Sequence, residues 1–234
     1  MGQYLHCFDL SDQLKCFNFC SRRVVESLFS TQLITSDNKP NPRNFEIENL
    51  INCRPIDIDG LSSPRMAIVY QASIYRTLSR PLTADEQIVV KKADLEIEFE
   101  RRRREINYGS SSRLSCVYLV DNDIDGRTVL QNMFVGTFGR PLIVEVDILN
   151  NMELTKCDHH WLQKYYDEPK DEYIVNYWTG VPLNDKFPSW EYLLEGTIVL
   201  TLQEQANEID RHVETEFPTY YEQIQLERQN SNKY

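Results

Sequence analysis

The densest group of metal-ligand side chains in the sequence is Cys157-Asp158-His159-His160. Thiolate, carboxylate and imidazole groups are the usual zinc ligands in proteins. Two adjacent histidines point to different faces of either a helix or a strand, so one ion cannot easily use both. We therefore expect a structural or surface role for this segment and no metal site.

Four consecutive arginines, Arg101 to Arg104, are of the residue type that contacts phosphate groups. Successive side chains fan around a helix axis, and glutamates flank this run. A solvated helix face laced with salt bridges is therefore the favoured interpretation. The sequence has none of the standard phosphate-loop, dinucleotide, zinc-protease or nucleophile-elbow motifs.

Three further stretches combine residue types that suit a nucleotide. They are Tyr4-Leu5-His6, the segment 111–118, and the segments 177–180 and 190–196 taken together. A histidine such as His6 can donate to a ribose hydroxyl, and Arg113 can pair bidentately with a pyrophosphate. Tyr177 and Trp178 can stack on a flat ring. Their order along the chain is more informative than any one of them.

In that order the segments resemble the ADP-ribosyltransferase superfamily, and most of all an uncharacterised bacterial and phage family within it. Members open with an aromatic-His strand, carry an E-x-x-x-R helix before a P-S-R-F-x-S-V-F strand, and continue with Y-W-x-G and W-E-x-L-L. The corresponding segments here are 100–105, 112–118, 177–180 and 190–194. Leu114 and Cys116 depart from the second motif. The match covers most of residues 1–202, with an apparent insertion near 36–82.

The resemblance implies a cleft between two small antiparallel sheets that binds NAD as a substrate. It assigns His6 to the adenine ribose. It assigns Ser112, Ser115 or Tyr118 to the nicotinamide side.

The resemblance also implies a glutamate that stabilises the positive charge formed on the ribose when nicotinamide leaves. Glu191, in Trp190-Glu191-Tyr192-Leu193-Leu194, is the expected catalytic residue. Glu195 is the alternative, although it precedes Gly196 and is expected at a turn.

Local patterns predict the elements that position these residues. Strands are expected at 3–8, 114–120 and 141–147, with strand-like runs at 190–194 and 197–202. Helices are expected at 20–34, 125–136 and 154–166 and beyond 203. A further helix over 84–107 should begin at Thr83, which forms a capping box with Glu86. Its inward residues should be Ile88, Leu95, Phe99 and Ile106.

Composition sets limits on the class of protein. The 234 residues carry a net charge of −11 and are 41% hydrophobic, which excludes wholesale disorder and a general nucleic-acid binder. No apolar run approaches the ~20 residues that a spanning helix needs, so we expect no membrane partner. The six cysteines form no C-x-x-C pair, and with no secretory signal apparent we expect them reduced in the cytoplasm.

These observations predict an α+β fold with split antiparallel sheets and flanking helices. Residues 1–202 should form one domain, and 203–234 a C-terminal surface helix and tail. The expected function is mono-ADP-ribosylation of a protein or nucleic-acid acceptor with NAD, by an enzyme of phage or effector type. The alternative is a non-catalytic acidic binding or inhibitor protein with the same fold. The oligomeric state is left open.

Three consequences follow for the folded chain. His6 and Glu191 should face the same cleft. The arginines 101–104 should lie largely in water, each replaceable by alanine at a cost within about 0.5 kcal/mol. Glu191→Gln should slow NAD turnover without much effect on folding, provided that the carboxylate is exposed.

Overall fold

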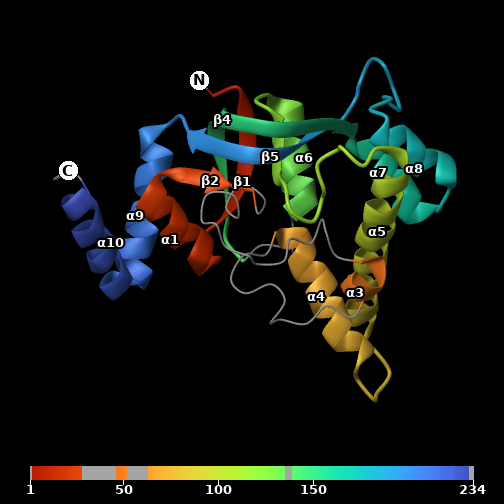
Figure 1. The fold of residues 1–234 in the computed structure, drawn as a ribbon, viewed down its shortest axis with the longest axis horizontal. Helices are drawn as coiled ribbons and strands as arrows, with labels where there is room; N and C mark the ends of the chain where they lie inside the picture. The colour runs from red at the N-terminus through yellow and green to blue at the C-terminus, as the bar shows by residue number, and fades with distance from the viewer. Residues whose placement is uncertain (1, 28–45, 52–62, 135–138, 232–234) are drawn as a thin grey trace. The chain divides into compact units, whose positions relative to one another are not determined.

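The computed structural model describes residues 2–27, 46–51, 63–134 and 139–231 (Figure 1). In chain order, the elements are β1 (Tyr4–Asp9), α1 (Gln13–Arg22), β2 (Val24–Glu26), α3 (Ile47–Ile51), α4 (Pro64–Arg76), α5 (Ala84–Ile106), β3 (Val117–Asp121), α6 (Ile124–Phe134), β4 (Pro141–Asp158), α7 (His159–Asp167), α8 (Asp171–Trp178), β5 (Trp190–Leu200), α9 (Gln203–Glu216) and α10 (Pro218–Ser231). The strands of these ranges form an antiparallel sheet in the order β2-β5-β3-β1-β4, and β4 also pairs with β5. The predicted mixture of helices with an antiparallel sheet is confirmed.

The chain packs as two compact units, each assembled from segments far apart in sequence. Unit 1 contains Met1–Glu26, Tyr118–Asn150 and Thr197–Tyr234, and unit 2 contains Ser27–Val117 and Asn151–Gly196. The expected division at residue 202 stays a prediction. Of the expected insertion, residues 36–45 and 52–62 lie outside the described residues, while α3 and α4 belong to unit 2.

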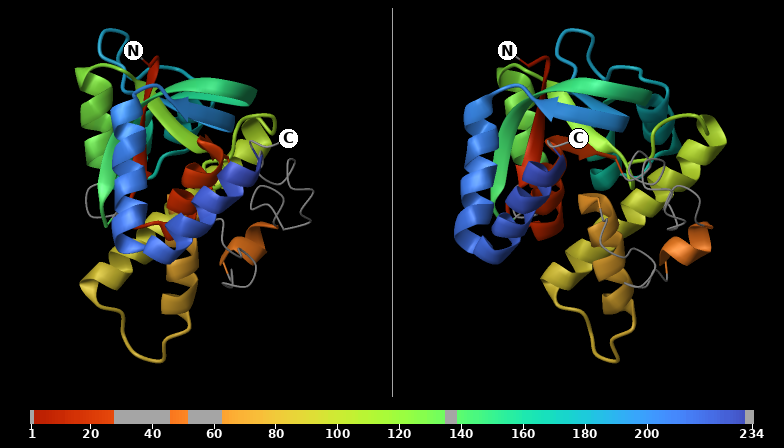
Figure 2. Two further views of the ribbon diagram at one scale, coloured as in Figure 1. Left: turned by 90° about the vertical axis from the view of Figure 1, so that its left-hand side faces the viewer. Right: turned by 60° about the vertical axis from the view of Figure 1, so that its left-hand side comes forward.

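Unit 1 is organised around β1. This strand pairs antiparallel with β3, where Leu5 faces Val120, and with β4, where His6 faces Val144. Residues 4–8 of β1 are buried in succession, as expected of a strand that is paired on both sides and covered on both faces. Helix α1 packs against α9 and α10 (Figure 2). The C-terminal segment therefore forms two helices that pack on the unit.

Unit 2 is organised around the antiparallel helix pair α4 and α5 (Figure 1). Their facing residues form an apolar core with Leu50 and Leu114. The predicted start of α5 is confirmed, because the Thr83 hydroxyl accepts from Glu86 N at 3.3 Å and a Glu86 carboxylate oxygen accepts from Thr83 N at 2.8 Å. The helix ends at Ile106, close to the predicted end.

Several predicted boundaries are wrong. The helix expected over 20–34 ends at Arg22 because Arg23 takes a left-handed conformation with φ of 63°, and β2 then pairs with β5. Residues 28–34 lie outside the described part of the chain. The expected helix at 154–166 begins only at His159, since the preceding residues extend β4. Residues 113–115 form a turn, and β3 starts at Val117.

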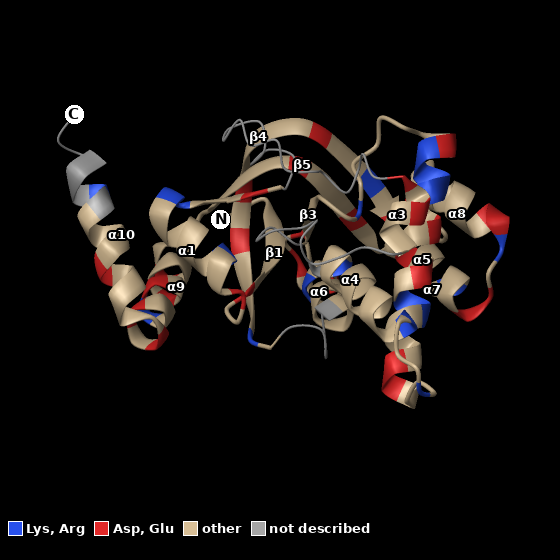
Figure 3. Cartoon of the chain, turned by 60° about the horizontal axis from the view of Figure 1, so that its bottom comes forward, with Lys and Arg blue, Asp and Glu red and all other residues tan. Residues whose placement is uncertain are grey.

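The expectation that arginines 101–104 lie largely in water is also wrong. The Arg101 side chain is 42% exposed, but those of Arg102 and Arg104 are only 18% exposed. The Arg103 side chain is 0% exposed and donates to both carboxylate oxygens of Glu100, at 2.9 and 2.8 Å. Ile88, expected to pack inward, is 46% exposed. Figure 3 marks charges of both signs along α5. The spacing of apolar residues did not predict the buried face of α5 correctly, because part of that face consists of paired charged side chains.

Among the helices of the described residues, none combines the length and the apolar character required to cross a bilayer.

The contrast between Arg101 and Arg103 gives a direct test of this packing. Arg103→Ala should lower the free energy of unfolding by about 3–5 kcal/mol, because it leaves a buried carboxylate without its main partner. Arg101→Ala should cost about 1 kcal/mol or less, since Arg101 is 42% exposed in its pairs with Glu98 and Glu105. Urea unfolding of both variants measures this difference. Equal losses would contradict the buried ion pair.

Candidate functional site

A fully buried arginine is the centre of a polar cluster in unit 2. The Arg113 side chain is 0% exposed, and its Nε and Nη2 donate to the two carboxylate oxygens of Glu96 at 2.8 and 3.0 Å. Its Nη1 donates to Glu191 Oε1 at 2.6 Å and to the Tyr177 hydroxyl. The planar guanidinium matches a carboxylate in this two-point geometry, which makes the pair strong and directional. Arg113 therefore holds two carboxylates from different elements in fixed positions.

Separate elements supply the members of this cluster. Glu96 comes from α5, Arg113 from the turn before β3, His159 from the first position of α7, Tyr177 from α8 and Glu191 from the second position of β5. The turn that carries Arg113 is closed by the Ser112 carbonyl, which accepts from Cys116 N at 3.0 Å. The cluster thus depends on the tertiary packing of unit 2.

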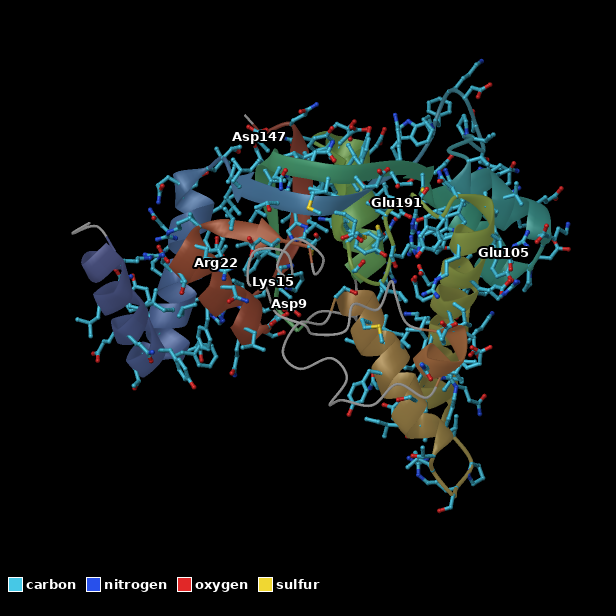
Figure 4. All side chains as sticks on the ribbon, in the orientation of Figure 1. Asp9, Lys15, Arg22, Glu105, Asp147 and Glu191 are labelled. Atoms are coloured by element: carbon cyan, nitrogen blue, oxygen red, sulfur yellow. The ribbon has the colours of Figure 1, made fainter. Side chains whose placement is uncertain are left out.

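Glu191 is buried and ionised. Burial by itself raises the pKa of this carboxyl, but the Arg113 guanidinium and the hydrogen bonds from His159 and Tyr177 hold the pKa well below its usual range. Figure 4 shows the residue on β5. A carboxylate in this setting keeps its negative charge at any physiological pH.

The two oxygens of Glu191 differ in their remaining capacity to accept hydrogen bonds. Oε1 accepts from both Arg113 and the Tyr177 hydroxyl, so its two lone pairs are used. Oε2 accepts from His159 Nδ1 at 3.3 Å, and one lone pair remains. Of these three partners only His159, with a side chain 17% exposed, reaches solvent. Oε2 is therefore the oxygen with capacity for a further hydrogen bond, in a side chain that is itself 0% exposed.

The cluster is close to electrically balanced. Besides Arg113, the guanidinium of Arg65 lies 3.4 Å from Glu96. Burial raises the pKa of Glu96, but the charges of Arg113 and Arg65 outweigh burial and lower it. Two guanidinium groups thus offset the charges of Glu96 and Glu191, which makes their burial tolerable.

Ser112 bonds to a neighbouring ionic group that is carried by α5. Its hydroxyl donates to Glu100 Oε2 at 2.8 Å, and the same glutamate pairs with Arg103 and Arg104. Ser112 is fully buried. Its expected place on the nicotinamide side stays a prediction.

Ser115 and Glu195 form a separate buried pair in unit 2. The Ser115 hydroxyl donates to Glu195 Oε1 at 2.6 Å. The expectation that Glu195 lies at a turn is wrong, because β5 runs without interruption through Gly196 to Leu200. Glu195 is fully buried in this strand. Its extended backbone comes from strand pairing, which overrides the turn tendency of the glycine that follows.

In unit 1, the His6 ring uses both of its nitrogens. Nδ1 lies 2.8 Å from the Tyr118 carbonyl oxygen, which can only accept, so Nδ1 carries the proton. Nε2 lies 3.0 Å from the Lys15 ammonium, which can only donate. Burial and the Lys15 charge lower the pKa of His6 well below its usual value, consistent with a neutral ring. As it stands, this ring has no donor left for a ribose hydroxyl.

The aromatic candidates are part of the packed interior. Tyr177 and Trp178 are buried, and the ring centroid of Phe99 lies 5.1 and 6.4 Å from theirs. The Trp178 indole donates to the Phe99 carbonyl at 3.0 Å. The Tyr118 side chain is also buried. Stacking of these rings on a ligand stays a prediction.

The structure gathers Arg113, Tyr177 and Glu191 from the predicted set, and it adds Glu96 and His159. His159 belongs to the segment Cys157–His160, for which a structural or surface role was expected. Adjacent side chains point to different faces, and this was the signal in the sequence that His159 and His160 have different surroundings. Glu96 carried no signal beyond its place four residues before Glu100. His6 belongs to unit 1 and Glu191 to unit 2, and their common cleft stays a prediction.

Within the described ranges, no group of three or more histidine, cysteine or carboxylate residues is arranged to hold a metal ion. A family model described as "Protein of unknown function (DUF2441)" matches residues 70–211. This range includes the whole Arg113 cluster except Arg65. No curated protein matches the chain.

The ionised state of Glu191 predicts a pH-dependent contribution to stability. Its folded pKa is depressed, so its contribution is complete above the unfolded value of about 4.3 and is lost as the pH falls toward the folded pKa. At about pH 7, Glu191→Gln should lower the free energy of unfolding by about 3 kcal/mol, since Arg113 keeps Glu96 as a partner. Folding is not expected to be neutral to this change, because the carboxylate is buried.

Urea unfolding of both proteins between about pH 7 and about pH 3 measures the difference. The gap between wild type and Glu191→Gln should narrow in acid. A gap that does not depend on pH would show that Glu191 is not the buried charge described above.

Proposed function

The chain belongs to the DUF2441 family of proteins of unknown function, and from its own residues we propose that it is a mono-ADP-ribosyltransferase. It uses NAD as a substrate and modifies a protein or nucleic-acid acceptor. Glu191 is the catalytic carboxylate. The order of the sequence motifs supports this reaction class, and the state of Glu191 supports the residue.

The observation that carries the proposal is the fixed charge of Glu191. Loss of nicotinamide leaves positive charge on the ribose, and a preorganised carboxylate shielded from water stabilises that charge more than a mobile one. Arg113 and Tyr177 immobilise Oε1, and Oε2 retains one acceptor position for a ribose hydroxyl. Glu195 is the weaker candidate, because it is fully buried and its Oε1 accepts from the hydroxyl of Ser115, which is itself buried.

The other site roles belong to the proposal as well. The resemblance assigns His6, and Ser112, Ser115 or Tyr118, to NAD. Side-chain chemistry adds Arg113, Tyr177 and Trp178. The side chains of His6, Ser112, Arg113 and Ser115 already have a partner in the chain. Binding of NAD then has to compete with these contacts, and this predicts modest affinity. We place the enzyme in the cytoplasm, where the five described cysteines would stay reduced; all are free and buried.

A second candidate function is a non-catalytic acidic binding protein. It is favoured by the ion pairs of Arg113, because its guanidinium binds Glu96 and Glu191 and is not free to bind a pyrophosphate. The net charge of −11 suits a basic partner. This candidate predicts association that weakens with salt and no consumption of NAD.

NAD turnover by matched variants tests the enzyme. Glu191→Gln should lower the rate of nicotinamide release by about 100- to 1000-fold, because the amide cannot stabilise developing positive charge. NAD affinity should change little, since the amide still accepts a hydrogen bond from the ground-state ribose. The control is Glu172→Gln, an exposed position on α8, which should behave as wild type.

Both variants are assayed with a bacterial lysate as the source of acceptors, at a temperature where unfolding measurements show them folded. Mass spectrometry then detects acceptors that gain one ADP-ribosyl unit. Wild-type turnover by Glu191→Gln would remove Glu191 from the mechanism. Absence of nicotinamide release from wild type with every acceptor would favour the binding protein.

A further inference from the structure

The backbone around His159 is held at several points. Asp158 is fully buried and caps α7 through His160 N at 3.0 Å. The same carboxylate accepts from Leu183 N at 2.8 Å and from Ser189 N at 3.1 Å. His159 N in turn donates to the Ser189 carbonyl at 2.8 Å. His159 therefore starts its helix from an anchored position, which suits a side chain that has to act with a defined geometry.

The hydrogen bond to Glu191 determines which ring nitrogen of His159 carries a proton. Glu191 is a carboxylate that can only accept, and its Oε2 lies 3.3 Å from Nδ1. Nδ1 is therefore the protonated nitrogen of the neutral ring, and Nε2 has a lone pair. Among the described residues, Nε2 has no hydrogen-bond partner, and the side chain is partly open to solvent.

We propose that Glu191 and His159 form a carboxylate–imidazole dyad in which His159 Nε2 is the general base for the acceptor. This inference rests on the proposed ADP-ribosyl transfer. A buried carboxylate that orients a histidine and stabilises its protonated form is an established arrangement for proton abstraction. Here the same carboxylate serves both partners of the reaction: the ribose through its open acceptor position and the acceptor through the imidazole.

The step balances as follows. The nucleophilic atom of the acceptor forms a bond to the anomeric carbon of the ribose, while the bond from that carbon to the nicotinamide nitrogen breaks. Nicotinamide leaves with the bonding electron pair, which neutralises its ring nitrogen. The proton of the nucleophile passes to His159 Nε2, and solvent later removes it.

His160 provides a matched control in the next position. Its Nδ1 also lies near a buried carboxylate, Asp158 Oδ1, at 3.1 Å, and its side chain is 46% exposed. Asp158, however, is engaged by three backbone N–H groups and has no hydrogen bond to Glu191. His160 has the same chemistry without the connection to the proposed catalytic carboxylate.

The test compares His159→Ala, His159→Gln and His160→Ala in the nicotinamide-release assay with acceptor present. Both His159 variants should be slower by about 10²- to 10⁴-fold, the usual contribution of a general base. The glutamine side chain keeps a donor for Glu191 Oε2 but has no basic lone pair. His159→Gln therefore distinguishes loss of the base from loss of the hydrogen bond that supports the fold. Added imidazole should restore part of the rate to His159→Ala and none to His159→Gln. His160→Ala should match wild type.

Two results overturn the dyad while leaving the transferase intact: wild-type rates in both His159 variants, or a loss in His159→Ala that imidazole does not restore. A second measurement needs no turnover. Nitrogen-proton NMR of the histidine rings should show His159 as the Nδ1–H form in wild type and mainly as the ordinary Nε2–H form in Glu191→Ala. An Nε2–H form in wild type overturns the dyad. A wild-type protein that releases no nicotinamide overturns both the transferase and the base role, even if the Nδ1–H form is seen.

Discussion

The buried guanidinium of Arg113 is the interaction on which the rest of unit 2 depends. It joins a glutamate of helix α5 to a glutamate of strand β5, and it contacts a tyrosine of helix α8. A buried charge is tolerable only when every neighbour is correctly placed, because an uncompensated ion in the interior costs several kcal/mol. The network therefore favours a single arrangement of these elements over apolar packing that could slide.

Helix α5 carries further buried and paired charges along its length. Its buried face carries Glu96, Glu100 and Arg103 at spacings of four and three, beside apolar residues such as Phe99. These spacings keep the ionic groups on one side of the helix. Glu100 then binds Ser112, which starts the turn that carries Arg113. Two ionic clusters thus share one helix and one turn, so a change in either is expected to reach the other.

The same constraint shapes the proposed chemistry. Immobilising Glu191 through one oxygen leaves the second with a free acceptor position and a partly exposed histidine beside it. Preorganisation of this kind is paid for during folding and is then available when charge develops in a transition state. The candidate groups of unit 1 follow a different pattern, since His6 is neutral between the Tyr118 carbonyl and Lys15. The charged candidates Arg113, Glu191 and Glu195 thus all belong to unit 2, whereas His6 belongs to unit 1.

The sequence by itself determined the elements whose signals are local. The Thr83 and Glu86 capping box, the first strand and the helix after Asp121 depend on residues within a few positions of one another, and all three were predicted. Only the tertiary structure decided the rest. Val24 to Glu26 become a strand because β5 pairs with them, and Glu195 stays extended for the same reason. Likewise Arg103 and Arg101 are chemically identical, two positions apart, and differ only in whether their side of the helix is covered. Burial depends on partners far away in the chain, and no local pattern contains them.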